Sequence, residues 1–211
     1  MADTQSNDSL PSAQANEAVP LESSLHTKKK NIFRWDRQQL FLFFLAYSVL
    51  GWCYEVFLEV VIYGWGFSNR GFLFGPYCPV YGFGALLLLL FLLPLKEKYG
   101  KRPVTPILLF VAGGLITTGL ELLTSYALEA INGEFLWNYS QYAWQFQGRI
   151  ALSPSLRFAA GSLLILYVLQ PLLEKGLSYL GAKKQYRLFL LSGGLFVLDF
   201  TVRMISVVLA L

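Results

Sequence analysis

Apolar residues in this chain are concentrated in five long segments, which are separated by shorter polar or glycine-rich stretches. The segments run over about residues 39–63, 79–95, 104–131, 155–173 and 188–211. An α-helix needs about 20 residues to cross the hydrocarbon core of a bilayer, and each segment is near or above that length. The pattern therefore predicts an all-α, polytopic integral membrane protein. We expect a single transmembrane domain over residues 32–211, built as a bundle of about five helices.

Residues 1–31 have a different composition, rich in Ser, Ala, Asn, Gln and Glu and without apolar periodicity. Such a segment cannot bury enough apolar surface to fold, so it is predicted to be a disordered tail. In the whole chain of 211 residues, 55% are hydrophobic and 14% are charged. Soluble domains carry about 25% charged residues. The low charged fraction therefore also indicates that the outer surface of this protein contacts the lipid bilayer.

The positions of Lys and Arg predict how the bundle is oriented. Thirteen of the seventeen basic residues lie before the first segment, between the second and third, or between the fourth and fifth. In a bundle of five helices these three regions share one side, and basic residues accumulate on the cytoplasmic side of membrane proteins. We therefore expect a multi-pass protein of the cell membrane with a cytoplasmic N-terminus. The net charge of +4 is explained by this asymmetry and gives no reason to expect nucleic acid as a partner.

Two connections fall on the predicted outer side, Gly64–Pro79 and Asn132–Ser155. Both are rich in aromatic residues and glycine instead of being simply polar. Segments of this kind either lie in the membrane interface as an aromatic belt or fold back into the protein as re-entrant loops. The sequence leaves both alternatives open.

Ionisable residues inside the apolar segments gather at one depth. Counting about 1.5 Å per residue from the basic side places Glu55, Glu121, Arg157 and Arg203 roughly 24–28 Å away from it, and Asp199 roughly 18 Å away. Two acids and two arginines from four helices are thus expected near the outer edge of the hydrocarbon. Ionisable residues within a membrane are by default candidates for a functional site. The alternative is a set of paired charges that only fixes the packing of the helices.

Local spacing indicates which side chains share a helix face. Glu55 and Glu59 are four residues apart, and so are Asp199 and Arg203, in the order that favours an ion pair within one helix. The third segment carries a stripe of small and polar residues at helical spacing: Gly114, Thr118, Glu121, Ser125 and Glu129. The polar chemistry is therefore expected on a few inward faces at the outer end of the bundle.

Several motifs resemble one known family in order and spacing. They are Gly51-Trp52-Cys53-Tyr54-Glu55, the block from Asn69-Arg70-Gly71 to Tyr81-Gly82-Phe83-Gly84, Leu128-Glu129, Trp137-Asn138-Tyr139-Ser140 and Gly148-Arg149-Ile150. Over about residues 40–170 the chain resembles the bacterial membrane family named Putative ABC-transporter type IV. It departs from that family's pattern at Asn138, Gln147 and Ala151, where the family usually has Asp, Asn and Cys.

Together, the buried charges and the shared motifs define one set of candidates for a substrate-binding or structural ionic cluster. The set comprises Glu55, Glu59, Asn69, Arg70, Glu121, Glu129, Arg149, Arg157, Asp199 and Arg203. We expect no metal site and no cofactor, because His26 lies in the tail and Cys53 and Cys78 have no metal-ligand spacing. No catalytic residue is predicted.

The resemblance implies a permease-like component of an ABC-type transporter, with an outward-facing charged vestibule for a polar solute or a lipid headgroup. No G-x-x-x-x-G-K-[ST] motif occurs in the chain, so a separate ATP-binding subunit is expected as a partner. Five helices are few for an alternating-access pathway, which favours a homo-oligomer. One alternative is an accessory or sensor protein that binds a partner through its outer loops. A membrane enzyme of the outer leaflet is less favoured, because no nucleophile with a base occurs at a recognisable spacing.

Overall fold

The structure is a computed structural model that describes residues 34–69, 71–133 and 137–210. The predicted tail and Arg70 lie outside the described residues. Residues 35–211 form one compact unit. Its elements, with η denoting π-helical turns, are α1 (Arg37–Phe57), η2 (Leu58–Ile62), α2 (Pro79–Phe91), α3 (Leu93–Tyr99), α4 (Thr105–Asn132), β1 (Gln145–Phe146), β2 (Ile150–Ala151), α5 (Leu152–Leu164), η3 (Ile165–Leu169) and α6 (Gln170–Ala210).

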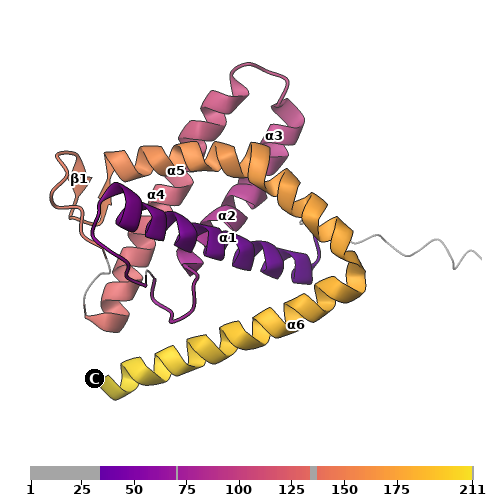
Figure 1. Cartoon of the computed structure of the whole chain (residues 1–211). Helices are drawn as coiled ribbons and strands as arrows, with labels where there is room; N and C mark the ends of the chain where they lie inside the picture. The colour runs from indigo at the N-terminus through magenta and orange to yellow at the C-terminus, as the bar shows by residue number, and fades with distance from the viewer. Residues whose placement is uncertain (1–33, 70, 134–136, 211) are drawn as a thin grey trace, which may run out of the picture. The chain divides into compact units, whose positions relative to one another are not determined.

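The described residues contain four helices that are long and apolar enough to cross a membrane: Arg37–Ile62, Pro79–Tyr99, Thr105–Ile131 and Leu152–Leu209. The last has 58 residues and as a straight helix would be roughly 87 Å long, nearly three times the hydrocarbon thickness. Gly181 breaks it with φ 66° and ψ 157°, and Figure 1 shows the chain turning back there. This element therefore supplies two spans, which confirms the predicted all-α membrane bundle of about five helices.

We name the two ends of the bundle by what lies there. The loop end carries residues 63–78, called loop one, and residues 133–151, called loop two. The basic end carries α3, the connection from α3 to α4, and the break at Gly181. Helix α1 begins at the basic end with a capping box, in which Asp36 Oδ1 accepts the Gln39 N–H (2.8 Å) and the Gln39 side chain accepts the Asp36 N–H. Helix α4 ends at the loop end, where Gly133 takes the left-handed conformation of a helix C-cap.

Helical structure continues past residue 173 to Gly181, although Pro171 lies within it. The π-helical turn η3 accommodates this proline. The Gln170 N–H bonds to the Ile165 carbonyl, five residues back. In that register the next donor would be Pro171, which has no N–H. The Leu166 carbonyl instead accepts a hydrogen bond from Lys96 Nζ (2.8 Å), so a basic side chain of α3 replaces the missing backbone donor.

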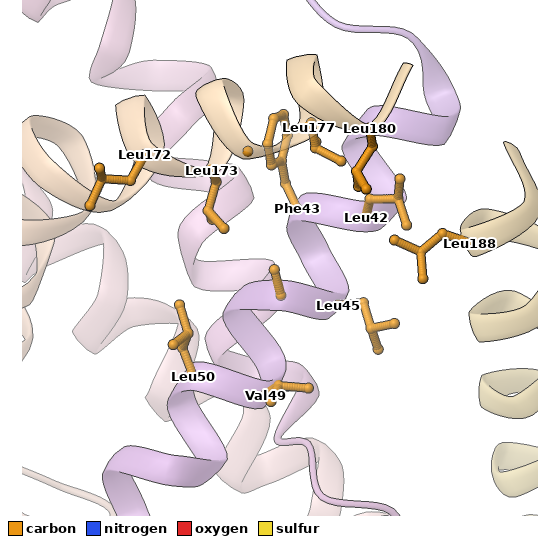
Figure 2. A pocket seen from close by; sticks show the side chains of 12 residues that line it. Leu42, Phe43, Leu45, Val49, Leu50, Leu172, Leu173, Leu177, Leu180 and Leu188 are labelled. Carbon is orange, nitrogen blue, oxygen red and sulfur yellow. The ribbon is translucent and has the colours of Figure 1, made fainter. Parts of the chain in front are cut away.

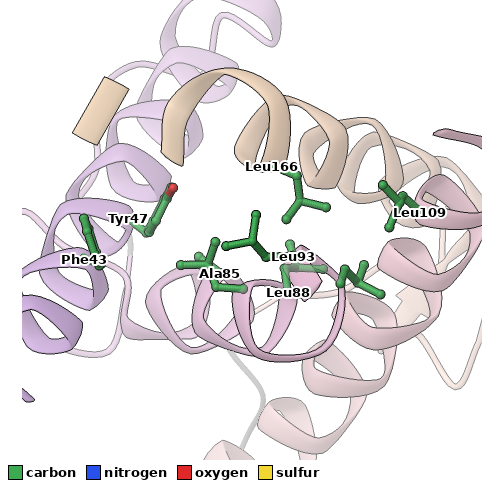
Figure 3. Packing of buried hydrophobic residues seen from close by; sticks show 9 residues of the cluster. Phe43, Tyr47, Ala85, Leu88, Leu93, Leu109 and Leu166 are labelled. Carbon is green, nitrogen blue, oxygen red and sulfur yellow. The ribbon is translucent and has the colours of Figure 1, made fainter. Parts of the chain in front are cut away.

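The buried core lies towards the basic end, where α1, α2, α4 and η3 meet (Figure 3). Helix α1 packs mainly on α2, and α4 packs mainly on α5. The polar group inside this region, Tyr47, is satisfied because its hydroxyl donates to Gln170 Oε1 (2.9 Å). The core residues are Phe43, Tyr47, Ala85, Leu88, Leu89, Leu92, Leu93, Leu109 and Leu166.

Close approach of α1 and α2 depends on Gly82. A Cβ atom at this position would lie 2.3 Å from Ser48 Oγ and 2.5 Å from the Phe44 carbonyl oxygen. The second atom belongs to the backbone of α1, so the two helices would have to separate. Small residues at helix contacts are the usual means of close packing in membranes, where the hydrophobic effect does not drive helices together.

We predict that Gly82→Ala destabilises the bundle by about 1–3 kcal/mol, the usual cost of overpacking a tight contact. The control is Gly119→Ala, because a Cβ at Gly119 would meet no atom within 4 Å and alanine favours the helix. Thermal unfolding of the purified proteins in detergent measures the difference. Equal midpoints for the two variants would contradict the proposed helix contact.

Candidate functional site at the loop end

Asp199 of α6 attaches loop one to the bundle. Its Oδ1 accepts the Phe74 N–H (3.2 Å), and its Oδ2 accepts both the Gly75 N–H (2.8 Å) and the Tyr77 hydroxyl. Ten residues, roughly 15 Å of helix, separate Asp199 from the end of its span at Leu209. Loop one therefore reaches down along α6 to bond this carboxylate, and this geometry favours the re-entrant alternative for loop one.

Arg203 lies one turn beyond Asp199 but does not pair with it. Its guanidinium is 4.9 Å from the centre of the Phe72 ring and 5.4 Å from that of Phe74. In the described part of the chain, no ion pair within 4.0 Å joins Asp199 and Arg203, so the predicted intrahelical pair is not formed. The reason is that the backbone and Tyr77 of loop one already occupy the carboxylate, while aromatic faces of the same loop contact the cation.

Glu59, in the π-helical turn η2, holds the first half of loop one. Ser68 donates to it from its hydroxyl (2.7 Å) and from its backbone N–H (3.3 Å). Asn69 connects the loop to α1 and to itself, because its side chain accepts from Trp52 Nε1 (2.8 Å) and donates to the Phe74 carbonyl (2.8 Å). Both predicted candidates thus shape loop one.

Arg149 organises loop two from a buried position, with 7% of its surface exposed. Its Nη2 forms an ion pair with Glu129 Oε2 (2.5 Å), and its Nη1 donates to Ser125 Oγ (3.1 Å). The guanidinium also lies 4.1 Å from the centre of the Tyr126 ring. All three partners belong to α4, so Arg149 fixes loop two to the end of that helix. The ion pair of Arg149 and Glu129 therefore fits the alternative given for the predicted cluster, in which paired charges only fix the packing.

The hairpin of β1 and β2 is closed by a turn over Phe146 to Arg149, in which the Arg149 N–H bonds to the Phe146 carbonyl (3.0 Å). Its two central residues, Gln147 and Gly148, have φ values of 54° and 68°. Positive φ at both positions is typical of a type I′ turn. Asparagine tolerates this conformation better than other non-glycine residues, which explains why asparagine suits the position that Gln147 occupies here.

Glu121 is the most deeply buried acid of the loop end, together with Glu59, with 6% of its surface exposed. Its Oε1 accepts the Tyr139 hydroxyl of loop two (2.9 Å). Its Oε2 is buried and has no hydrogen-bond partner among the described residues. The same holds for Thr118 Oγ1, one turn earlier on the same face of α4. An unpartnered buried polar atom is costly, so these oxygens stand out in the structure.

Two more charges lie near Glu121. Both Glu55 and Arg157 are close enough to affect it electrostatically. Glu55 accepts the Tyr81 hydroxyl of α2, and Arg157 Nη1 donates to the Tyr63 hydroxyl of loop one (3.1 Å). The Nε of Arg157 is buried without a partner in the described part of the chain. We call Glu55, Glu121 and Arg157, with the tyrosines bonded to them, the central cluster.

The structure thus divides the predicted residues among three places. Glu55, Glu121 and Arg157 come together, whereas Arg203 and Asp199 lie with loop one. Glu129 and Arg149 form a pair beside loop two. The sequence analysis missed the tyrosine donors, of which Tyr77 and Tyr81 stand in the block shared with the family. The missed residues are Tyr63, Tyr77, Tyr81 and Tyr139. Tyrosines in or next to the segments that carry buried charges are the signal that could have indicated them.

For two of the loop tyrosines, Tyr77 and Tyr139, the surroundings raise the pKa of the hydroxyl and keep it neutral. Burial raises the pKa of the Tyr139 hydroxyl, and the nearby Glu121 carboxylate raises it further. Burial and the bond to Asp199 likewise raise the pKa of Tyr77. A raised pKa stabilises the folded state below the ordinary tyrosine value of about 10, and this contribution is lost as the pH rises through the raised pKa. Both phenols therefore act as donors at neutral pH.

The loop end brings two acids, an arginine and tyrosine hydroxyls together among the described residues. No group of three or more His, Cys, Asp or Glu side chains that could hold a metal ion occurs among the described residues. The acids of the central cluster are held by phenol hydroxyls, and two carboxylates face a single guanidinium. What the cluster offers is a small, partly unsatisfied polar region inside an apolar bundle.

Comparison with known proteins identifies the family. A model of the family described as Putative ABC-transporter type IV matches residues 42–204. The chain belongs to this family. The match includes both loops, the central cluster, Asp199 and Arg203, so the whole loop end lies within the part that defines the Putative ABC-transporter type IV family. No curated protein and no solved structure matches the chain.

We predict that Asp199→Asn loosens loop one of this family member. The side chain loses its charge, and hydrogen bonds to charged groups contribute about 1.5–3 kcal/mol. The reporter is Cys78, which is buried beside Tyr77. In a Cys53→Ala background, Cys78 should react with a maleimide at least about tenfold faster in the variant. The control is Ser192→Ala, because the Ser192 hydroxyl donates to the Leu188 carbonyl of its own helix (2.7 Å) and does not hold loop one. Unchanged labelling in Asp199→Asn would refute the role of the carboxylate in holding the loop.

Proposed function

We propose that this chain is the membrane-embedded, permease-like component of an ABC-type transporter, and that its central cluster binds a polar solute or a lipid headgroup. Membership of the Putative ABC-transporter type IV family supports the transport role. A separate subunit would supply ATP hydrolysis, since the sequence contains no P-loop motif.

The proposal rests mainly on one observation: Glu121 is buried among apolar helices and one of its carboxylate oxygens lacks a hydrogen-bond partner among the described residues. A charge inside a membrane costs about 2.5–3.5 kcal/mol even on the most favourable scale. A purely structural acid would be expected to have both oxygens satisfied, as Glu59 and Asp199 illustrate. A binding site, in contrast, leaves groups open for the ligand.

The charges of the central cluster indicate the chemistry of that ligand. Two carboxylates, Glu55 and Glu121, stand against one guanidinium, Arg157. Arg157 donates to the Tyr63 hydroxyl (3.1 Å), and no ion pair within 4.0 Å joins it to either acid among the described residues. A ligand with a positively charged group would be attracted by the two acids and could donate to the open Glu121 oxygen, and a zwitterion could also bind Arg157 through its anionic part.

The direction from which the ligand arrives follows from the orientation we propose. Lys and Arg gather at the basic end, and basic residues mark the cytoplasmic side. The loop end would then face the outside of the cell membrane, with the two loops covering the central cluster. The exposed Trp65 and Trp144, at 67% and 77%, suit the membrane interface and would anchor the loops there.

We predict that Glu121→Gln abolishes transport while the protein still inserts. Membrane vesicles that contain the chain and its host membrane proteins would be supplied with ATP and a panel of labelled solutes. The panel would hold cationic amines, zwitterionic amino acids, phosphate and a phospholipid labelled in its headgroup. Transport of the accepted compound should fall at least about tenfold, the loss expected when a buried charged contact is removed.

Glu97→Gln is the matched control, because Glu97 is exposed in α3 at the opposite end. Normal transport by Glu121→Gln would contradict the proposed site. If no compound moves in a manner that depends on the chain, and crosslinking at Trp137 to Trp144 captures a protein, the accessory or sensor role replaces the transport role.

A further inference from the structure

A groove towards the basic end, whose lining contains no residue of the central cluster, has features of a second binding site. It has a volume of about 490 Å³ and lies between α1 and the two arms of α6. Every residue that lines it is apolar, including Leu42, Leu45 and Val49 from α1 and Leu177, Leu180 and Leu188 from α6. Figure 2 shows these side chains pointing from three helical segments into one space. The volume falls within the range of about 300–1,000 Å³ that is usual for small-molecule sites.

The break at Gly181 creates the groove. The two arms of α6 diverge from this residue, and their leucines line the space beneath the bend without filling it. On the first arm, Gly176 leaves part of the wall without a side chain, and a Cβ at this position would meet no atom within 4 Å. The groove is therefore bounded by the backbone geometry of α6, and apolar side chains alone cover its walls.

Basic residues lie close in sequence to the residues that line the groove. Lys183, Lys184 and Arg187 follow Gly181 directly and are exposed, and Leu188 of the lining is the next residue. Arg37 is exposed in the first turn of α1, five residues before Leu42. In the part of the chain that the structure describes, none of these four cations takes part in an ion pair within 4.0 Å. Two acids lie near these residues in sequence: Asp36 is occupied in capping α1, and Glu174, next to Leu173 of the lining, accepts a hydrogen bond from Gln170 Nε2 (3.2 Å).

An apolar slot with a cationic rim is complementary to one class of molecule. We propose that the groove binds the acyl chain of an anionic phospholipid, whose phosphate headgroup is held by Arg37, Lys183, Lys184 and Arg187. Basic clusters beside membrane helices attract anionic lipid headgroups, and a long apolar slot takes an extended hydrocarbon chain. The lipid would fill the space under the bend and so fix the angle between the two arms of α6.

A helix of a second copy does not fit this site as well. Aromatic contacts hold α1 against the second arm of α6, with ring centres 5.4 Å apart for Phe41 and Phe189 and 5.6 Å apart for Phe44 and Phe196. A helix with its side chains is about 10–12 Å across, so it could not enter between these elements without separating them. A second chain would also bring its own cations to the same rim.

Native mass spectrometry of the full-length protein tests the proposal. The protein would be extracted from vesicles made of phosphatidylcholine and phosphatidylglycerol in a 4:1 ratio, and the retained lipids would be counted. We expect one tightly retained phosphatidylglycerol per chain, enriched roughly tenfold over its share in the vesicle. Gly176→Leu should lose this lipid because its side chain fills the groove, whereas Gly194→Leu should keep it. A Cβ at Gly194 also meets no atom within 4 Å but lies outside the lining.

A triple variant distinguishes the contribution of the basic residues to lipid binding from that of the apolar groove. Lys183→Gln, Lys184→Gln and Arg187→Gln together should retain a lipid but lose the preference for phosphatidylglycerol. Lys98→Gln, Lys101→Gln and Arg102→Gln remove the same charge at the basic end outside the groove, and should keep the preference. Equal effects of the two triple variants, no enrichment in the wild type, or retention by Gly176→Leu would each overturn the proposal. A lipid-free dimer that Gly176→Leu dissociates would assign the groove to a second copy.

Discussion

Buried carboxylates inside a medium of low dielectric constant need donors, and this need determines how the loop end of the bundle is built. Four acids inside the spans take their donors from hydroxyl groups: Ser68 for Glu59, Tyr77 for Asp199, Tyr81 for Glu55 and Tyr139 for Glu121. Three of these donors lie in the loops, so the loops must fold onto the helices to supply them. A hydroxyl donor satisfies an acid without adding a second buried charge, which avoids the desolvation cost of an ion pair.

The two loops therefore connect helices that are distant in the sequence. Loop one follows η2 but is bonded to Asp199, more than 120 residues later. Loop two follows α4 and returns to it through Arg149, while Tyr139 reaches Glu121. Because each loop is bonded to acids inside the membrane, a change at those acids is also a change in the loop that covers them. The loops and the acids beneath them are therefore one connected hydrogen-bonded unit.

At the basic end, the groups that need partners are backbone groups at places where a helix is irregular. The π-helical turn before Pro171 leaves the Leu166 carbonyl without a backbone donor, and Lys96 supplies one. The break at Gly181 turns one apolar element of 58 residues into two arms. Cations at this end thus take part in the fold itself, and those around Gly181 also border an apolar groove. The molecule separates its polar interior at one end from its packed core and basic rim at the other.

The sequence by itself determined the all-α membrane class, the approximate number of spans and the family. These features depend on local properties, namely the length of apolar runs, the rise of a helix and an ordered set of motifs. Only the tertiary structure decided which groups satisfy each charge. The spacing of Asp199 and Arg203 predicted an ion pair, yet loop one provides three donors to the acid and aromatic rings to the cation. Helical spacing describes neighbours on one helix, whereas the partners of a buried charge come from segments that meet only when the chain is folded.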